Sequence, residues 1–215
     1  MCNPSSVRLG TLCHIQRYPL KSLRPQPLDR ARVELDGLAG DRAGALFVRS
    51  GAQRVGKTYR GKENDELHLI ADPNGALDAA ARRGVEVELR CGERFFDAAP
   101  ISLLFDRWLD DVSRYVGYAV EWQRFRPNFF VQAAANFNAS EDALVDATVA
   151  IGSARFTVRA PTRRCAVPTY DPHGRGKDLR VQRFIVNERD NVMGVYCDVA
   201  SAGEVAVGDA VIFNA

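Results

Sequence analysis

The chain has 215 residues, of which 46% are hydrophobic and 26% are charged, enough to bury a core in one large domain or two small ones. The 29 Lys and Arg nearly balance the 27 Asp and Glu, for a net charge of +2. The chain is therefore not one of the strongly basic proteins that bind nucleic acid or anionic lipid through their overall charge. No apolar stretch approaches the roughly 18 residues of a membrane helix, and the polar start lacks the apolar core of a secretion signal. We therefore expect a cytoplasmic protein with no membrane and no nucleic-acid partner.

The cysteines and histidines give no sign of a disulfide framework or a structural zinc site. The five cysteines are widely spaced and odd in number, and they form no C-x-x-C pair. The three histidines form no H-x-x-x-H pattern. This usage is typical of a protein kept in a reducing compartment. The cysteines are Cys2, Cys13, Cys91, Cys165 and Cys197.

Short strands dominate the elements predicted for the first half. Val7 to Tyr18 is rich in β-prone residues and is expected to stop at Pro19. One helix is predicted over residues 102–116, because Leu104, Trp108, Val112 and Val116 recur every four residues on one face. The shorter elements are strands over 32–35, 45–48, 68–71 and 85–90 and a helical turn over 77–83.

The second half is also predicted to be mostly β-structured. Glycines punctuate its apolar runs, and one short helix is expected over 179–186. Many short strands with few helices favour a β-barrel-like or α+β fold over a doubly wound sheet. The two halves are expected to pack as one body. The predicted strands span 121–125, 129–132, 148–151, 154–159, 193–199 and 211–213.

Two arginines directly precede Cys165. Positive charge beside a thiol favours the thiolate, which attacks electrophiles and binds soft metals. The alternative is the ordinary one, in which the cysteine is a small buried hydrophobe without reactivity. The turn-forming residues 171–174 follow it.

Three other polar clusters could join this thiol, although each taken alone is an ordinary polar loop. Lys21 and Ser22 follow a strand end and suit a phosphate. Arg42 closes a glycine-rich turn, and its guanidinium can either pair with Asp41 or face a bound anion. Arg126, Pro127 and Asn128 add a second bidentate donor and an amide. Together the clusters suit a ligand with an anionic tail and a soft metal head.

The order of these motifs resembles the MOSC domain family. That domain stands at the C-terminus of molybdenum cofactor sulfurases, in the mitochondrial amidoxime-reducing component and in small bacterial stand-alone proteins, and this chain looks most like the last. The likeness runs from about Leu9 to Phe213, nearly the whole chain. The motifs are Arg-Tyr-Pro-Leu-Lys-Ser at 17–22, Gly-Leu-x-Gly-Asp-Arg at 37–42, Arg-Pro-Asn at 126–128, Arg-Arg-Cys at 163–165 and Val-Gly-Asp at 207–209.

The resemblance implies a fold, a cofactor and a set of site residues. The implied fold is mainly β or α+β: a MOSC-type β-barrel core over residues 98–215, packed with an N-terminal β-barrel portion over residues 1–97 and a few short helices. The implied cofactor is the molybdenum cofactor, molybdopterin. Cys165 would ligate the molybdenum and act as the catalytic residue. The implied cofactor-binding residues are Lys21, Ser22, Arg42, Arg126, Asn128 and Arg164.

Three functions remain open at this stage. The first is a molybdenum-cofactor oxidoreductase that reduces a small N-hydroxylated substrate with electrons from a separate donor protein, because the chain has no flavin or iron–sulfur motif of its own. The second is a non-catalytic module that carries or delivers sulfur or the cofactor, with Cys165 as a persulfide site. The third is an RNA- or protein-binding barrel without a cofactor. The near-neutral net charge counts against RNA as the partner.

Overall fold

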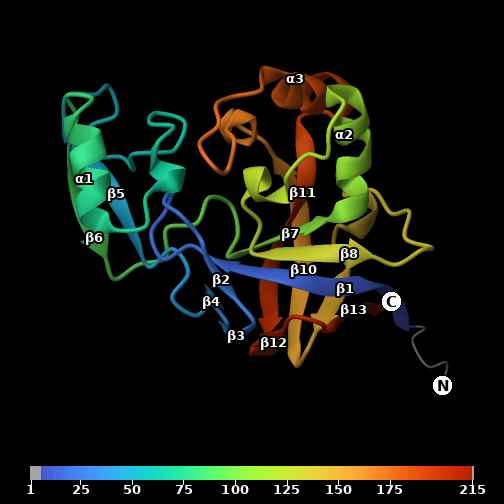
Figure 1. Ribbon diagram of the computed structural model, residues 1–215. Coiled ribbons are helices and arrows are strands. Elements are labelled where there is room, and N and C mark those ends of the chain that lie inside the picture. Colours follow the sequence, from blue (N-terminus) through green and yellow to red (C-terminus); the bar gives the residue numbers. More distant parts are fainter. Residues whose placement is uncertain (1–5, 215) are drawn as a thin grey trace.

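A closed barrel of seven strands forms the body of the protein (Figure 1). The computed structural model describes residues 6–214. Around the barrel the strand order is β13-β9-β10-β11-β7-β8-β1, and a pairing between β13 and β1 closes it. All neighbours are antiparallel except β7 and β8, which run parallel. The strands are β1 (Ser6–Arg17), β7 (Ile101–Phe105), β8 (Phe129–Ala133), β9 (Thr148–Ile151), β10 (Ala154–Arg163), β11 (Val192–Ser201) and β13 (Ala210–Asn214).

The barrel interior is filled by apolar side chains, as closure of a small barrel requires. Leu12, Phe129 and Phe156 are fully buried there, and the Phe129 and Phe156 rings pack edge to face with centroids 5.5 Å apart. Gly10 pairs with Ala133 of β8 and with Val211 of β13, and the register of β1 with β13 shifts between Arg8 and Gly10. A Cβ atom at this position would lie 2.2 Å from the Gln132 carbonyl oxygen, so only glycine permits this close approach of strands.

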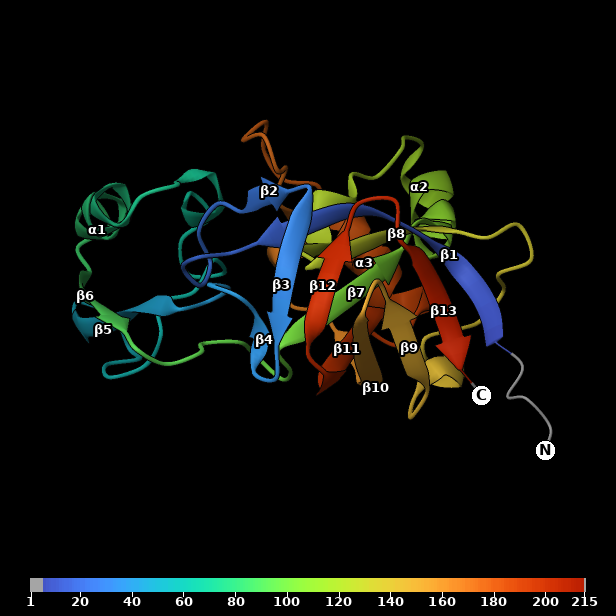
Figure 2. The same cartoon turned by 90° about the horizontal axis from the view of Figure 1, so that it is seen from below.

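The first half of the chain contributes both to the barrel and to structure beside it. Its strand β1 belongs to the barrel, and β2 (Gln26–Leu28) extends the sheet from β1. A three-stranded sheet joins β3 (Arg30–Glu34), β4 (Gly37–Leu38) and β12 (Gly203–Ala206), and Figure 2 shows β3 and β12 side by side. The pairings among residues 6–214 close one barrel.

A small lobe projects from the barrel, at the left of Figure 1. It consists of the antiparallel pair β5 (Gly44–Ser50) and β6 (Glu86–Cys91) covered by α1 (Pro73–Ala81), which lies between them in the sequence. Asp72 caps the helix by accepting a hydrogen bond from the Gly75 amide at 2.8 Å. The lobe has its own apolar cluster, separate from the barrel core, in which Leu46 and Leu67 are fully buried.

Two further helices cover one end of the barrel. They are α2 (Asp110–Val116) and α3 (Leu179–Glu188), and Tyr115 of α2 packs on Phe184 of α3 with ring centroids 5.1 Å apart. Val181 and Ile185 of α3 point into the core. No helix within residues 6–214 has the length and apolar character needed to cross a bilayer.

The predicted barrel-type fold is confirmed, and most predicted strands are observed within a few residues. The helix predicted over 102–116 is wrong in its first half, where residues 101–105 form β7 and only 110–116 are α-helical. All five residues of β7 are buried, and a fully buried strand shows no alternation that would distinguish it from a helix. The strands predicted over 68–71 and 121–125 are also wrong, because 3-10 turns occupy residues 67–69 and 122–125.

Candidate functional site

A cavity of about 300 Å³ lies between the small lobe and the barrel. The loops that follow β1 and β10, the turn that precedes β8 and the segment 60–62 of the lobe all reach it. Six of the seven predicted site residues line it, namely Lys21, Ser22, Arg42, Arg126, Arg164 and Cys165. Residues far apart in sequence therefore meet at one place.

Lys21 and Ser22 sit on the turn that follows β1. The Lys21 amide donates to the Gly44 carbonyl at 2.9 Å, which ties this turn to the start of β5. The Lys21 ammonium lies 2.6 Å from a carboxylate oxygen of Asp97. The Ser22 hydroxyl accepts a hydrogen bond from the Gly61 amide at 3.1 Å. This serine therefore connects the barrel turn to the lobe and keeps its own proton free to donate.

Arg42 is held by groups behind the cavity wall. Its guanidinium pairs with buried Asp41 and also donates to the Asn128 side-chain oxygen at 3.2 Å. Asp41 in turn accepts from the Tyr18 amide at 2.6 Å. Burial alone would lower the pKa of Arg42, but the Asp41 carboxylate outweighs it and the pKa is raised.

Asn128 lies behind the cavity and does not line it. The side chain is 1% exposed. Its oxygen accepts from the Ser102 amide at 3.1 Å and the Ser102 hydroxyl at 3.0 Å, and its nitrogen donates to the Gln16 carbonyl at 3.2 Å. The structure therefore gives Asn128 a positioning contact with Arg42.

Arg126 follows a 3-10 turn (Trp122–Phe125) and occupies a left-handed conformation with φ 52°. Its guanidinium donates to the Leu23 carbonyl at 2.6 Å and lies over the Tyr18 ring, 4.4 Å from the centroid. Burial lowers the pKa of Arg126.

Arg164 and Cys165 follow the end of β10. The Arg164 guanidinium donates to the Met193 carbonyl at 2.7 Å and to the Phe125 carbonyl at 2.8 Å. Gly194 makes room for it, because a Cβ there would lie 3.1 Å from a guanidinium nitrogen of Arg164 and 2.9 Å from the Leu103 carbonyl oxygen. Burial lowers the pKa of Arg164. The thiol of Cys165 is exposed.

The cavity carries an excess of positive charge. Eight of its lining residues are Lys or Arg and one is Asp. Four of the eight have carboxylate partners among the described residues. Within that part of the chain, Lys62, Arg126, Arg163 and Arg164 have none. Arg126 and Arg164 are half-buried, so an anion bound beside either guanidinium would be less screened by water than on an open surface.

Backbone strain is concentrated around the same cavity. Six non-glycine residues within 6–214 have a positive φ, and three of them line the cavity: Ser22 at 72°, Arg42 at 46° and Arg126 at 52°. Each such conformation costs about 1–2 kcal/mol for an L-residue, and strained backbone tends to gather at functional sites. This signal is independent of the charge.

Several lining residues are not evident from the sequence. Tyr196 lies on β11, and His68 and Tyr170 come from the lobe and from the loop that follows β10. In the sequence these three residues stand among apolar or aromatic residues, and no motif distinguishes them from residues of the core. Arg60 and Lys62 also line the cavity, and the short basic run that they form around Gly61 is a sequence feature that indicates an anion-binding loop.

The sequence profile of the MOSC domain matches residues 93–212, more than half of the chain. No curated protein sequence matches the chain significantly. Among solved structures, the chain is similar to the YuaD protein from Bacillus subtilis, with a TM-score of 0.52 and 12% identity over 98% of this chain and 97% of that one. A crystal structure described as a hypothetical protein gives a TM-score of 0.50 and 12% identity over 96% and 68%. YiiM from Escherichia coli gives 0.47 and 13% identity over 93% and 70%.

The chain is a β-barrel protein with a cationic cavity and a thiol among the residues that line it. The chain belongs to the MOSC domain family, whose members are generally associated with the molybdenum cofactor. Likeness to the solved structures at these identities concerns the fold alone.

Proposed function

We propose that this protein binds the molybdenum cofactor in the cavity between the lobe and the barrel and uses it to reduce small N-hydroxylated compounds. One observation carries the proposal: two half-buried guanidiniums, which have no carboxylate partner among residues 6–214, lie on the wall that also bears an exposed thiol. The cofactor combines an anionic phosphate with a soft metal, so both halves of this arrangement match it.

The residues divide into those that would hold the anionic part and the one that would hold the metal. Arg126 and Arg164 offer guanidiniums already oriented by backbone carbonyls, so little conformational freedom is lost on binding. Lys21 and Ser22 add an ammonium and a hydroxyl proton from the turn after β1. Arg42 adds a guanidinium fixed by Asp41. Cys165 would ligate the metal through its thiolate.

When bound, the cofactor supplies a metal that can exchange two electrons with a substrate. In the overall reaction the N–O bond of the hydroxylated nitrogen breaks, and two electrons and two protons convert it to N–H and water. The electrons would come from a separate donor protein. The positive wall formed by Arg126 and Arg164 would stabilise negative charge that develops in the cavity.

The exposure of Cys165 supports a second candidate, a carrier that delivers sulfur or the cofactor to another protein. A thiol at the surface can reach a partner's site, whereas a thiol that serves only bound small molecules needs no such access. In this case Cys165 would hold a persulfide sulfur. Both candidate functions use the same cavity, but only the reductase converts a substrate repeatedly.

The test is to express the protein in a host that makes the molybdenum cofactor and to measure its metal content and absorbance. Loaded protein is then given a chemical reductant and a hydroxylamine, with Cys165→Ser as the control. Molybdenum bound at about one equivalent and amine formed only with intact Cys165 would support the reductase. Bound metal without amine formation would favour the carrier, and colourless, metal-free protein would refute both.

A further inference from the structure

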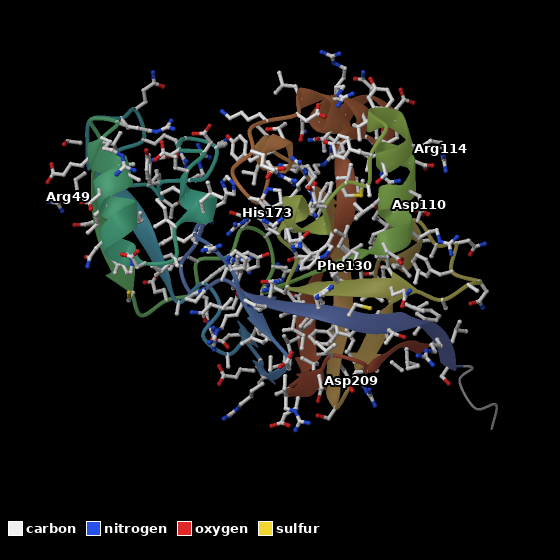
Figure 3. All side chains as sticks on the ribbon, in the orientation of Figure 1. Arg49, Asp110, Arg114, Phe130, His173 and Asp209 are labelled. Carbon is white, nitrogen blue, oxygen red and sulfur yellow. The ribbon has the colours of Figure 1, made fainter. Side chains whose placement is uncertain are left out.

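A second cavity, of about 280 Å³, adjoins the first cavity, which lies between the lobe and the barrel. The loop that carries His173 forms part of its outer side; in Figure 3 this residue lies between the lobe, marked by Arg49, and the barrel, marked by Phe130. The residues that line both cavities are His68, Arg124, Arg126, Val167 and Tyr170. The two cavities are therefore neighbours that share a wall.

The turn that follows β1 contributes to both cavities in succession. Lys21 and Ser22 line the first cavity, and Arg24 lines the second. Leu23, between them, is 1% exposed and packs in the apolar cluster of the lobe. The Arg24 amide donates to the Ile70 carbonyl at 2.9 Å, which fixes the backbone at this point. One turn therefore presents a cation to each cavity.

The second cavity carries positive charge that no lining carboxylate offsets. Arg24 and Arg126 each place a guanidinium in its lining, and neither has a carboxylate partner among residues 6–214. Within the same range, no Asp or Glu lines this cavity. Arg126 is half-buried, so its charge is less screened by water than that of an arginine on an open surface. The second cavity therefore attracts an anion.

The other charged groups beside this cavity compensate one another. Arg124 pairs with Glu121 at 3.0 Å and with Asp171 at 3.2 Å. Arg175 pairs with the same two carboxylates. The two positive and two negative charges of this cluster cancel. The lining histidines are neutral or positive in either protonation state, so they offset none of the charge of the two unpaired arginines.

Apolar residues form most of the remaining lining. The Tyr170 ring stacks on the His68 ring, with centroids 5.7 Å apart, so this part of the wall is flat and rigid. Apolar walls with a few placed charges are typical of sites for small molecules. The apolar residues are Pro25, Pro27, Val167, Tyr170 and Pro172. The second cavity therefore suits an anion with a flat apolar body.

We propose that the second cavity binds the anionic end of the substrate and that Arg24 selects substrates with a carboxylate on a flat apolar body, such as an aromatic ring. A guanidinium binds this planar anion through two parallel hydrogen bonds. The inference rests on the proposed function, in which the first cavity holds the cofactor and receives the N-hydroxyl group of the same substrate. Arg24 lines only the second of these two cavities, so it is a specificity residue for the substrate and no cofactor ligand.

Benzoate and benzamide are the probes for binding, because they have the same shape and differ in charge. Each is titrated into nitrogen-15-labelled protein without cofactor, and the backbone amide signals of Arg24 and Tyr170 are followed by NMR. We expect benzoate to bind more tightly than benzamide. Arg24→Gln should weaken benzoate about three- to tenfold and leave benzamide unchanged, because it removes one charge-assisted contact that is exposed to solvent.

Arg155→Gln is the matched control, because Arg155 is an exposed arginine on β10 that lines neither cavity, and it should bind benzoate like the wild type. Among residues 6–214 neither Arg24 nor Arg155 has an ion pair, so both variants should fold, and thermal unfolding checks this. Equal affinity for benzoate in Arg24→Gln and the wild type, or benzamide binding as tightly as benzoate, would overturn the proposal.

Substrate selection is measured on molybdenum-loaded protein with para-hydroxyaminobenzoate and para-hydroxyaminobenzamide. Arg24→Gln should raise KM for the carboxylate about three- to tenfold and change neither KM for the amide nor the molybdenum content. Equal use of both compounds by the wild type would overturn this inference and leave the proposed function standing. Metal-free wild type, or loaded protein that reduces neither compound, would count against the proposed function, and the benzoate titration would still decide whether the anion site exists.

Discussion

Substitutions at Arg126 can separate the energetic cost of its backbone conformation from the effect of its positive charge. Its φ of 52° places it in the left-handed region, where a Cβ costs about 1–2 kcal/mol and glycine pays no such cost. Arg126→Ala and Arg126→Gly remove the same guanidinium, its contact with the Leu23 carbonyl and its packing on the Tyr18 ring. The difference between the two variants therefore reports the backbone conformation alone.

We expect Arg126→Gly to be about 1 kcal/mol more stable than Arg126→Ala. The usual order is the reverse, because glycine loses more backbone entropy on folding. For a chain of this length, 1 kcal/mol corresponds to a difference of about 2–4 °C in the midpoint of thermal unfolding. Urea unfolding of the two variants without cofactor gives the same comparison at constant temperature.

The matched control is the pair Gln123→Ala and Gln123→Gly, in the same 3-10 turn but with a negative φ, where alanine should be the more stable. Both Arg126 variants should lose cofactor equally, because both lose the guanidinium. If Arg126→Ala is as stable as Arg126→Gly, the residue is not held in the left-handed region and the argument from strain fails.

Four further results are expected. Cys165→Ser should lose molybdenum while Cys91→Ser, which changes another exposed thiol, keeps it; equal metal contents would remove Cys165 as the ligand. Arg42→Ala should weaken cofactor binding about ten- to a hundredfold, with Arg42→Lys only partly restoring it, as measured by titration of apo-protein, and wild-type affinity in Arg42→Ala would make the arginine purely structural. Asn128→Ala should lower the free energy of unfolding by about 2–4 kcal/mol, because it leaves buried donors unpaired, and a loss below ~0.5 kcal/mol in urea would contradict that network. Burial raises the pKa of Asp171, but its hydrogen bonds with Arg175 and nearby amides outweigh burial and lower the pKa to about 2. The ionised carboxylate should therefore stabilise the fold fully above about pH 4, and this contribution should be lost as the pH falls through about 2. In acid unfolding, the stability of Asp171→Asn should converge with that of the wild type near about pH 2, and a constant gap between the two curves would contradict this prediction.

The sequence by itself determined the barrel-type fold and six of the residues that line the cavity between the lobe and the barrel. Period-two patterns and turn residues identify most strands, because they depend on local backbone chemistry and on one buried face. Thr148–Ile151 was predicted with the bounds that the structure has. The cluster that contains Cys165 could be identified because arginines beside a thiol carry their chemistry in the sequence.

The tertiary structure decided what depends on contacts between distant segments. Residues 101–105 form a strand because β11 and β8 flank them on both sides, and no local pattern encodes that burial. Asn128 lies behind the cavity wall because its side-chain amide is hydrogen-bonded to the Ser102 hydroxyl and the Gln16 carbonyl. His68, Tyr170 and Tyr196 line the cavity because the lobe, the loop after β10 and β11 meet there, and no local pattern marks these residues in the sequence. Burial and hydrogen-bond partners are properties of the assembled chain, so they could not be read from the sequence.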